Sequence, residues 1–238
     1  MTKTFHARSA LLAALVVTLL VTVASAGCGT TSAGTPSQII KKAIDAQGRL
    51  KSVTVDYESD VDLGLPGGNR SSSVSYKGSF QQPDRWKLAI RSSGVKSEVV
   101  IIGQKTWVKL PGSDTWTVKN TSSPLIGSSP DDVVASKYLK SAKNVQMVDQ
   151  KDNAYHMKFD LDLLTFARAF NLSGIDPALF KGKVAHLDVW VRKKDMFLQK
   201  ATMNFASQLG APVNGSLKMS TEIDFSNFNE PVSVEPPT

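Results

Sequence analysis

The stretch Val53-Thr54-Val55-Asp56-Tyr57-Glu58-Ser59-Asp60-Val61-Asp62-Leu63 decides the fold of this chain. Apart from Ser59, its odd-numbered residues are apolar, and all of its even-numbered residues are polar. Side chains of a β-strand point alternately to the two sides of the sheet, so this period of two predicts a strand with one buried face and one solvated face.

The same alternation recurs at intervals of roughly ten residues, separated by short turns rich in Gly, Pro, Asn and Asp. No helical pattern interrupts the first six of these segments, which therefore predict an antiparallel meander. The whole chain predicts an α+β fold built on one continuous antiparallel sheet of about eleven strands, with three or four helices. The expected strands are 53–63, 74–80, 85–91, 95–102, 106–110, 116–118, 145–148, 155–163, 184–192, 197–205 and 217–225.

Residue patterns that favour helices occur before the first expected strand and between some of the later strands. Thr35 is a helix cap, Pro36 suits the first helical position, and an apolar face follows to about Leu50. Two further helices are expected within 133–142 and 164–180, and a long loop over 207–215. The tail from residue 227 holds three prolines, which favour a position along an edge of the sheet.

Residues 1–27 have the pattern of an export signal. Two basic residues, Lys3 and Arg8, precede an uninterrupted run of apolar and small residues from 10 to 24. The following Ser25-Ala26-Gly27-Cys28 resembles a bacterial lipobox, in which the Cys thiol becomes acylated after cleavage in front of it. The family pattern prefers Leu where this chain has Ser25, and an ordinary signal peptide cleaved near residue 26 is the alternative.

Cleavage before Cys28 leaves 211 residues with 26 basic and 21 acidic side chains, a net charge of +5. The sequence then divides into a lipoprotein signal peptide (1–27), a lipidated Cys with a flexible tether (28–36) and one domain (37–238). Acyl chains on Cys28 anchor the protein to the cell membrane at its extracytoplasmic face. The positive charge favours an anionic membrane surface weakly, and no nucleic-acid partner is expected of an exported chain with scattered lysines.

The sequence contains few residues or motifs suited to catalysis or metal binding. The chain has one Cys and three His, which excludes an intrachain disulfide and a Cys-rich metal site. His156 and His186 fall on expected strands without a third ligand in register, so no metal is expected. There is no Gly-x-Ser-x-Gly elbow and no phosphate-binding loop. We therefore expect no catalytic residues, no cofactor and no enzymatic activity.

Three stretches of the chain carry a resemblance to a known family. Their order and pattern resemble the bacterial LppX/LprG-type lipid-carrier lipoproteins, which share the LolA/LolB-like half-barrel fold. The stretches are 38–44 leading into 53–57; 103–109 with Pro111-Gly112 and Trp116; and 187–191 followed by 223–228 and 231–234. The resemblance spans nearly all of the mature chain but includes no diagnostic catalytic motif.

The resemblance implies a curved sheet whose concave face, covered by helices, encloses an apolar cavity. A membrane lipid or glycolipid would place its acyl chains there and be carried across the cell envelope, with a membrane transporter as a candidate partner. The chain would act as a monomer. The alternative within the same fold is an envelope-stress sensor that binds a protein partner.

Two sets of side chains are the candidate ligand contacts. An apolar cavity for acyl chains would be lined mainly by bulky residues on one side of the strands, although the same pattern also suits a filled core. The cavity candidates are Tyr57, Tyr76, Phe80, Trp86, Leu88, Phe159, Leu161, Met203, Phe205 and Met219. The candidates for its entrance or lid are Leu125, Ile126, Phe166, Phe170 and Phe180.

Overall fold

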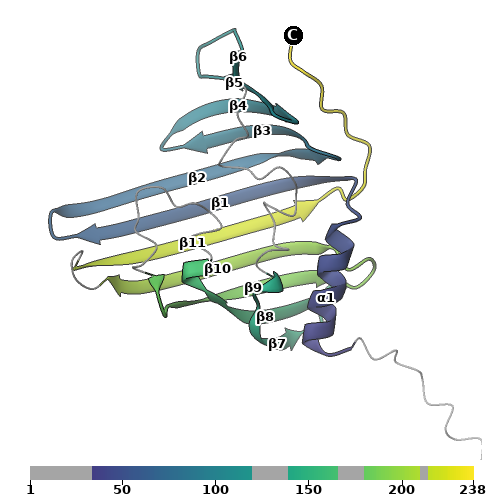
Figure 1. The fold of residues 1–238 in the computed structure, drawn as a ribbon, viewed down its shortest axis with the longest axis vertical. Helices are drawn as coiled ribbons and strands as arrows, with labels where there is room; N and C mark the ends of the chain where they lie inside the picture. Colours follow the sequence, from purple (N-terminus) through teal and green to yellow (C-terminus); the bar gives the residue numbers. More distant parts are fainter. Residues whose placement is uncertain (1–33, 120–138, 166–179, 210–213) are drawn as a thin grey trace, which may run out of the picture. The chain divides into compact units, whose positions relative to one another are not determined.

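The computed structural model describes residues 34–119, 139–165, 180–209 and 214–238. These residues form one complete α-helix and eleven β-strands (Figure 1). The elements are α1 (Pro36–Gln47), β1 (Ser52–Leu65), β2 (Gly68–Gln81), β3 (Arg85–Ser92), β4 (Val95–Ile102), β5 (Lys105–Lys109), β6 (Thr117–Lys119), β7 (Lys143–Asp149), β8 (Ala154–Asp162), β9 (Val184–Arg192), β10 (Leu198–Leu209) and β11 (Gly215–Ser226). Within these ranges, no helix is both long and apolar enough to cross a membrane.

All eleven strands belong to a single open, curved antiparallel sheet, as Figure 1 shows. Their order is β6-β5-β4-β3-β2-β1-β11-β10-β9-β8-β7, so almost every strand pairs with its neighbour in sequence. The one long-range pairing joins β1 to β11 and places both in the middle of the sheet. This confirms the predicted α+β class and the eleven-stranded sheet. The two helices expected within 133–142 and 164–180 lie mostly outside the described residues.

Helix α1 begins with the predicted cap. The Thr35 side chain accepts a hydrogen bond from the Gln38 amide (3.3 Å), and the Gln38 side chain accepts one from the Thr35 amide (2.8 Å). This reciprocal capping box satisfies two amides that have no partner inside the helix. The helix lies against β7 and ends at Gln47, a turn earlier than expected, because the Leu50 amide bonds to the Gln47 carbonyl in a closing turn.

Two strands are longer than the sequence pattern predicts. Strand β2 begins at Gly68, six residues before the expected Val74, because its backbone pairs with β1 along the whole hairpin up to Leu65. Its first half, Asn69–Ser73, has no apolar side chains and so carries no alternation signal. Strand β10 likewise continues to Leu209 through residues expected to be a loop, since they pair with β11.

The C-terminal tail crosses the ends of strands instead of lying along an edge of the sheet, which corrects the prediction (Figure 1). The Asn229 side chain accepts a hydrogen bond from the Lys51 amide at 2.7 Å. Farther on, the Val234 amide donates to the Gln81 side chain and its carbonyl accepts from Arg85. Because the tail's prolines cannot donate backbone hydrogen bonds to a neighbouring strand, side chains at the ends of β2 and β3 hold the tail. Val234 is buried there.

Candidate functional site

The register of the sheet places all ten cavity candidates on one side, which we call the apolar face. Tyr57 of β1 stands opposite Tyr76 of β2, and Phe80 of β2 stands opposite Trp86 of β3. Across β11, Met219 pairs with Phe205. The remaining four, Leu88, Phe159, Leu161 and Met203, fall on the same side through their own cross-strand partners. The alternation in sequence therefore predicted correctly which residues share a face.

Nine of these ten side chains are buried, and Tyr57 is half-buried. Burying a large apolar side chain contributes about 1.5–3 kcal/mol, so the apolar face is a main source of stability whatever else it binds. Of the entrance candidates, Phe180 is buried in the structure, with only 1% of its surface exposed. Leu125, Ile126, Phe166 and Phe170 lie outside the described residues, as do Cys28 and residues 1–33.

Aromatic pairs stiffen the apolar face between β1 and β3. The rings of Tyr57 and Tyr76 stack with centroids 4.5 Å apart and planes 11° apart. Phe80 and Trp86 form a tilted pair with centroids 4.9 Å apart. Cross-strand aromatic pairs of this kind add to the stability that burial provides, and they fix the orientation of the side chains that line this half of the face.

A small group of hydroxyls interrupts the apolar face near its centre. The Ser59 and Thr221 hydroxyl oxygens lie 3.0 Å apart, and both side chains are buried. Tyr57 precedes Ser59 by two residues on the same face of β1, and its phenol lies close enough to Ser59 and Thr221 for both to affect its pKa. Burial raises the pKa of Tyr57 above its ordinary value and the two neighbouring side chains partly oppose the shift, so the phenol is neutral at physiological pH. We call Tyr57, Ser59 and Thr221 the hydroxyl cluster.

The apolar face also contains a hydrogen-bond donor without an acceptor. The indole nitrogen of Trp86 is buried and has no hydrogen-bond partner among the described residues, and the side chain is fully enclosed. An unsatisfied buried donor is unusual and costs about 1–3 kcal/mol. The size of Trp86 makes it a cavity candidate in the sequence. Its unsatisfied indole N–H could not be predicted, because the residues around the indole come from the neighbouring strands β2 and β4.

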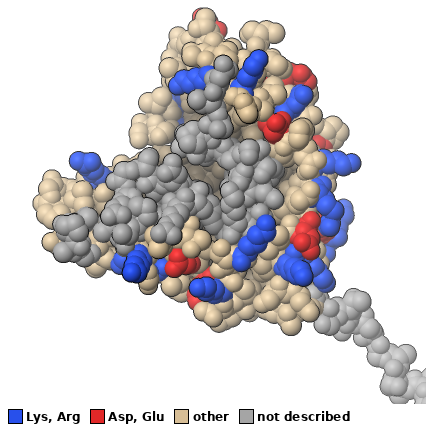
Figure 2. Space-filling view, viewed as in Figure 1, with Lys and Arg blue, Asp and Glu red and all other residues tan. Residues whose placement is uncertain are grey.

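The opposite side of the sheet, the polar face, carries the charges. Asp56 of β1 pairs with Lys77 of β2 at 2.6 Å, and Lys200 of β10 pairs with Glu222 of β11 at 2.5 Å. Such exposed pairs contribute little to stability. In the view of Figure 2, basic and acidic side chains of the described residues are interspersed around the margin, without a large patch of one sign. The β1 carboxylates of this face are all exposed, so the acidic side of β1 is a solvated surface, as its pattern indicated.

Two hollows bordered by described residues lie over the polar face. One, of about 740 Å³, extends along β2, β3 and β4 and is bounded by the loop 110–113 and by Arg91 and Lys96. The other, of about 440 Å³, lies beside Trp116 and residues 232–234. Among the cavity candidates only Tyr76 and Leu88 border these hollows, and the register directs both side chains to the other face. Neither hollow is the predicted cavity, which stays a prediction.

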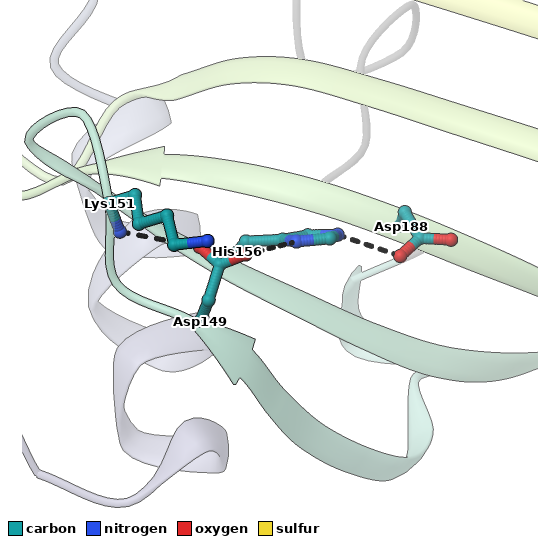
Figure 3. A network of polar contacts seen from close by, with 4 residues as sticks. All are labelled: Asp149, Lys151, His156 and Asp188. Atoms are coloured by element: carbon teal, nitrogen blue, oxygen red, sulfur yellow. Dashed lines mark hydrogen bonds and ion pairs between the residues drawn. The ribbon is translucent and has the colours of Figure 1, made fainter.

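The strands β7 to β9 hold a polar network that the sequence did not reveal. Figure 3 shows the His156 imidazole between two carboxylates, 3.4 Å from Asp149 and 2.8 Å from Asp188. The hydrogen bond from the Lys151 amide lowers the pKa of Asp149, and His156 acts in the same direction. His156 also stacks on Trp190, with ring centroids 4.2 Å apart. These contacts tie the edge strand β7 to the sheet.

His186, the other histidine on an expected strand, has a partner of its own. His186 lies 2.8 Å from Asp160, whose other oxygen accepts a hydrogen bond from Asn144. The Asn144 hydrogen bond is the main reason why the pKa of Asp160 falls below its ordinary value. Within the described ranges, no group of three or more His, Cys, Asp and Glu side chains has the arrangement of a metal site. The two histidines thus serve strand-to-strand contacts and do not converge on one site.

Comparison with solved structures identifies the fold. No protein-family model matches the chain, and no curated protein matches its sequence. The lipoprotein LppX of Mycobacterium tuberculosis superposes with a TM-score of 0.52 and 18% identity, over 84% of this chain and 98% of LppX. LprF of Mycobacterium bovis superposes with a TM-score of 0.50 and 15% identity, over 85% and 96% of the two chains. The chain therefore has the open half-barrel fold of LppX and LprF.

Proposed function

We propose that this protein is a membrane-anchored lipoprotein that binds the acyl chains of a lipid or glycolipid and carries them across the cell envelope. The observation that carries the proposal is the apolar face, on which bulky side chains from β1, β2, β3, β8, β10 and β11 share one side of a single sheet. The fold shared with the lipoprotein LppX supports it, as does the lipobox-like Cys28.

The mechanism is solvation without covalent chemistry. Each methylene group that moves from water to an apolar environment gains about 0.8 kcal/mol, so one acyl chain supplies enough free energy for stable binding. The ring pairs Tyr57–Tyr76 and Phe80–Trp86 offer flat, fixed apolar surfaces of the kind that ligand pockets use. A carrier of this kind leaves its ligand unchanged, and we propose no enzymatic step.

Anchoring at Cys28 would keep the carrier next to the membrane that supplies its lipid. Acyl chains on this thiol hold the chain at the extracytoplasmic face of the cell membrane. Residues 29–34 consist of Gly, Thr, Ser and Ala, a composition typical of flexible linkers. The tether would give the sheet domain freedom to turn its lipid-binding face toward the bilayer or toward a membrane transporter.

Native mass spectrometry of the full chain tests lipid binding. The protein is expressed in a bacterium with its first 27 residues, extracted in a mild detergent and released from micelles in the gas phase. We expect a mass adduct in the range of a diacyl lipid in addition to the modification of Cys28, and organic extraction should recover the same lipid. A protein that emerges without adduct and takes up no added dipalmitoylglycerol contradicts the proposed function.

Replacing Cys28 with alanine tests the anchor. We expect Cys28→Ala to move the protein from the membrane fraction to the soluble extracytoplasmic fraction, because no thiol remains for the acyl group. Metabolic labelling with an alkyne palmitate measures acylation directly, and Ser25→Ala is the matched control that keeps both the label and the membrane fraction. Equal labelling of wild type and Cys28→Ala would show that the attachment is elsewhere.

A further inference from the structure

The hydroxyl cluster is out of place on an otherwise apolar face. Ser59 and Thr221 occupy positions where the alternation of β1 and β11 calls for apolar residues, and valine would fit the strand better. Burying a hydroxyl is unfavourable unless it is hydrogen-bonded. Ser59 and Thr221 bond to one another across the two central strands, and the Tyr57 phenol lies beside them on the same face.

The three hydroxyls retain hydrogen-bonding capacity beyond the contacts between them. Each hydroxyl offers one donor and two acceptor lone pairs, and the Ser59–Thr221 hydrogen bond uses one of the three donors, so two O–H groups remain for a polar ligand atom. The Tyr57 side chain is half-buried, in contrast to Ser59 and Thr221. The cluster is therefore reachable at the Tyr57 end, where the phenol is held in its neutral, donating form by burial.

The surroundings of the cluster restrict the ligand group to an uncharged one. In the described part of the apolar face, the residues next to the cluster in register are uncharged: Val61, Val74, Tyr76, Met203, Met219 and Ile223. A carboxylate or phosphate brought here would lose its hydration without gaining a counter-ion, which is costly. An uncharged carbonyl oxygen suits the hydroxyl donors without that penalty.

Apolar surface extends from the cluster in both directions along the strands. Toward the start of β1 lie Val53 and Val55, with Phe80 and Trp86 beside them. Toward the β1–β2 turn, apolar surface continues on Val61 and Leu63 and on their β11 partners Met219 and Leu217, whereas their β2 partners are the polar residues Ser72 and Arg70. A ligand that fits has a polar linkage attached to a long apolar segment, which is the form of an acyl ester within a lipid.

We propose that the hydroxyl cluster binds the ester carbonyl of the acylated ligand and so selects ester lipids over hydrocarbons and ether lipids of the same length. This inference rests on the proposed function, because it names the binding site for the ester group of the same lipid whose acyl chains lie on the apolar face. The Tyr57 hydroxyl, together with whichever of the Ser59 and Thr221 hydroxyls does not donate in the hydrogen bond between them, donates to the carbonyl oxygen, and the acyl chain remains in apolar contact.

A competition between two lipids in native mass spectra tests this selection. The full chain is mixed with equal amounts of dipalmitoylglycerol, a diester, and dihexadecylglycerol, the diether with chains of the same length. One hydrogen bond of about 1 kcal/mol corresponds to about fivefold in binding, so we expect the diester adduct to exceed the diether adduct at least fivefold. Equal adducts overturn the inference and leave the proposed function standing, whereas the absence of both adducts overturns the proposed function.

Variants of the cluster show whether its hydroxyls cause the preference. In the double variant Ser59→Ala/Thr221→Val, and separately in Tyr57→Phe, we expect the diester preference to fall below about twofold while the diether still binds. Ser97→Ala is the matched control, a half-buried serine on the same face in β4, and should keep the wild-type ratio. An unchanged ratio in both the double variant and Tyr57→Phe would overturn the inference.

Discussion

Replacing Val74 with tryptophan is expected to abolish lipid binding while the sheet still forms. Val74 is a half-buried residue of β2 on the apolar face, directly opposite Ser59 and next to the hydroxyl cluster. An indole at this position fills the space that a ligand would occupy over the centre of the sheet, since it projects from the same side as Tyr76. We expect at least a tenfold loss of the diacylglycerol adduct in native mass spectra, which corresponds to about 1.4 kcal/mol.

The neighbouring residue provides the control for this substitution. Ser73 is exposed and points to the polar face, so Ser73→Trp adds the same side chain to the same strand on the other side. It should leave the lipid adduct unchanged, and circular dichroism should show that both variants keep their strands. Loss of the adduct in both variants, or in neither, would mean that the apolar face is not where the lipid binds.

Replacing Gly78 with alanine is expected to lower the free energy of unfolding by about 2–3 kcal/mol, as overpacking of a tight core does. Gly78 lies on the apolar face of β2 between Val55 and Leu88. A Cβ atom built on it would collide with the backbone oxygen of Lys87 and come within 2.8 Å of the Leu88 Cα. Because backbone atoms of β3 cannot move aside as a side chain can, the two strands would have to separate.

Urea denaturation followed by tryptophan fluorescence measures this effect, with Gly67→Ala as the control. Gly67 lies in the turn between β1 and β2, where a new Cβ has open space around it. We expect its free energy of unfolding to stay within about 0.5 kcal/mol of wild type, the range of ordinary surface substitutions. A Gly78→Ala protein as stable as Gly67→Ala would mean that β2 and β3 are less closely packed than the structure indicates.

Much of the fold could be predicted from the sequence because its signals are local. The alternation along Val53–Leu63 and its repeats indicated eleven strands and the face to which each side chain belongs, since this period follows from backbone geometry alone. Thr35 and Pro36 indicated the start of α1 for the same reason, because helix-start signals depend only on residues close in sequence.

Contacts between distant residues leave no comparable signal in the sequence. Ser59 and Thr221 are 162 positions apart, and each alone looks like a polar exception in an apolar pattern. The prolines of the C-terminal tail predict an edge position, whereas hydrogen bonds donated by Lys51 and Arg85 and accepted by Gln81 place the tail across the strand ends. The placement of His156 between Asp149 and Asp188 likewise depends on the pairing of β7, β8 and β9.

By itself, the amino-acid sequence determined the strands, the side of the sheet on which each residue lies and the lipobox-like pattern at Cys28. Only the tertiary structure decided that β1 and β11 pair in the middle of the sheet. That pairing brings Ser59 beside Thr221 and makes one hydroxyl cluster within an apolar face. The physical reason is that alternation sets the direction of a side chain, whereas strand order and register, which join the two ends of the domain, set its neighbours.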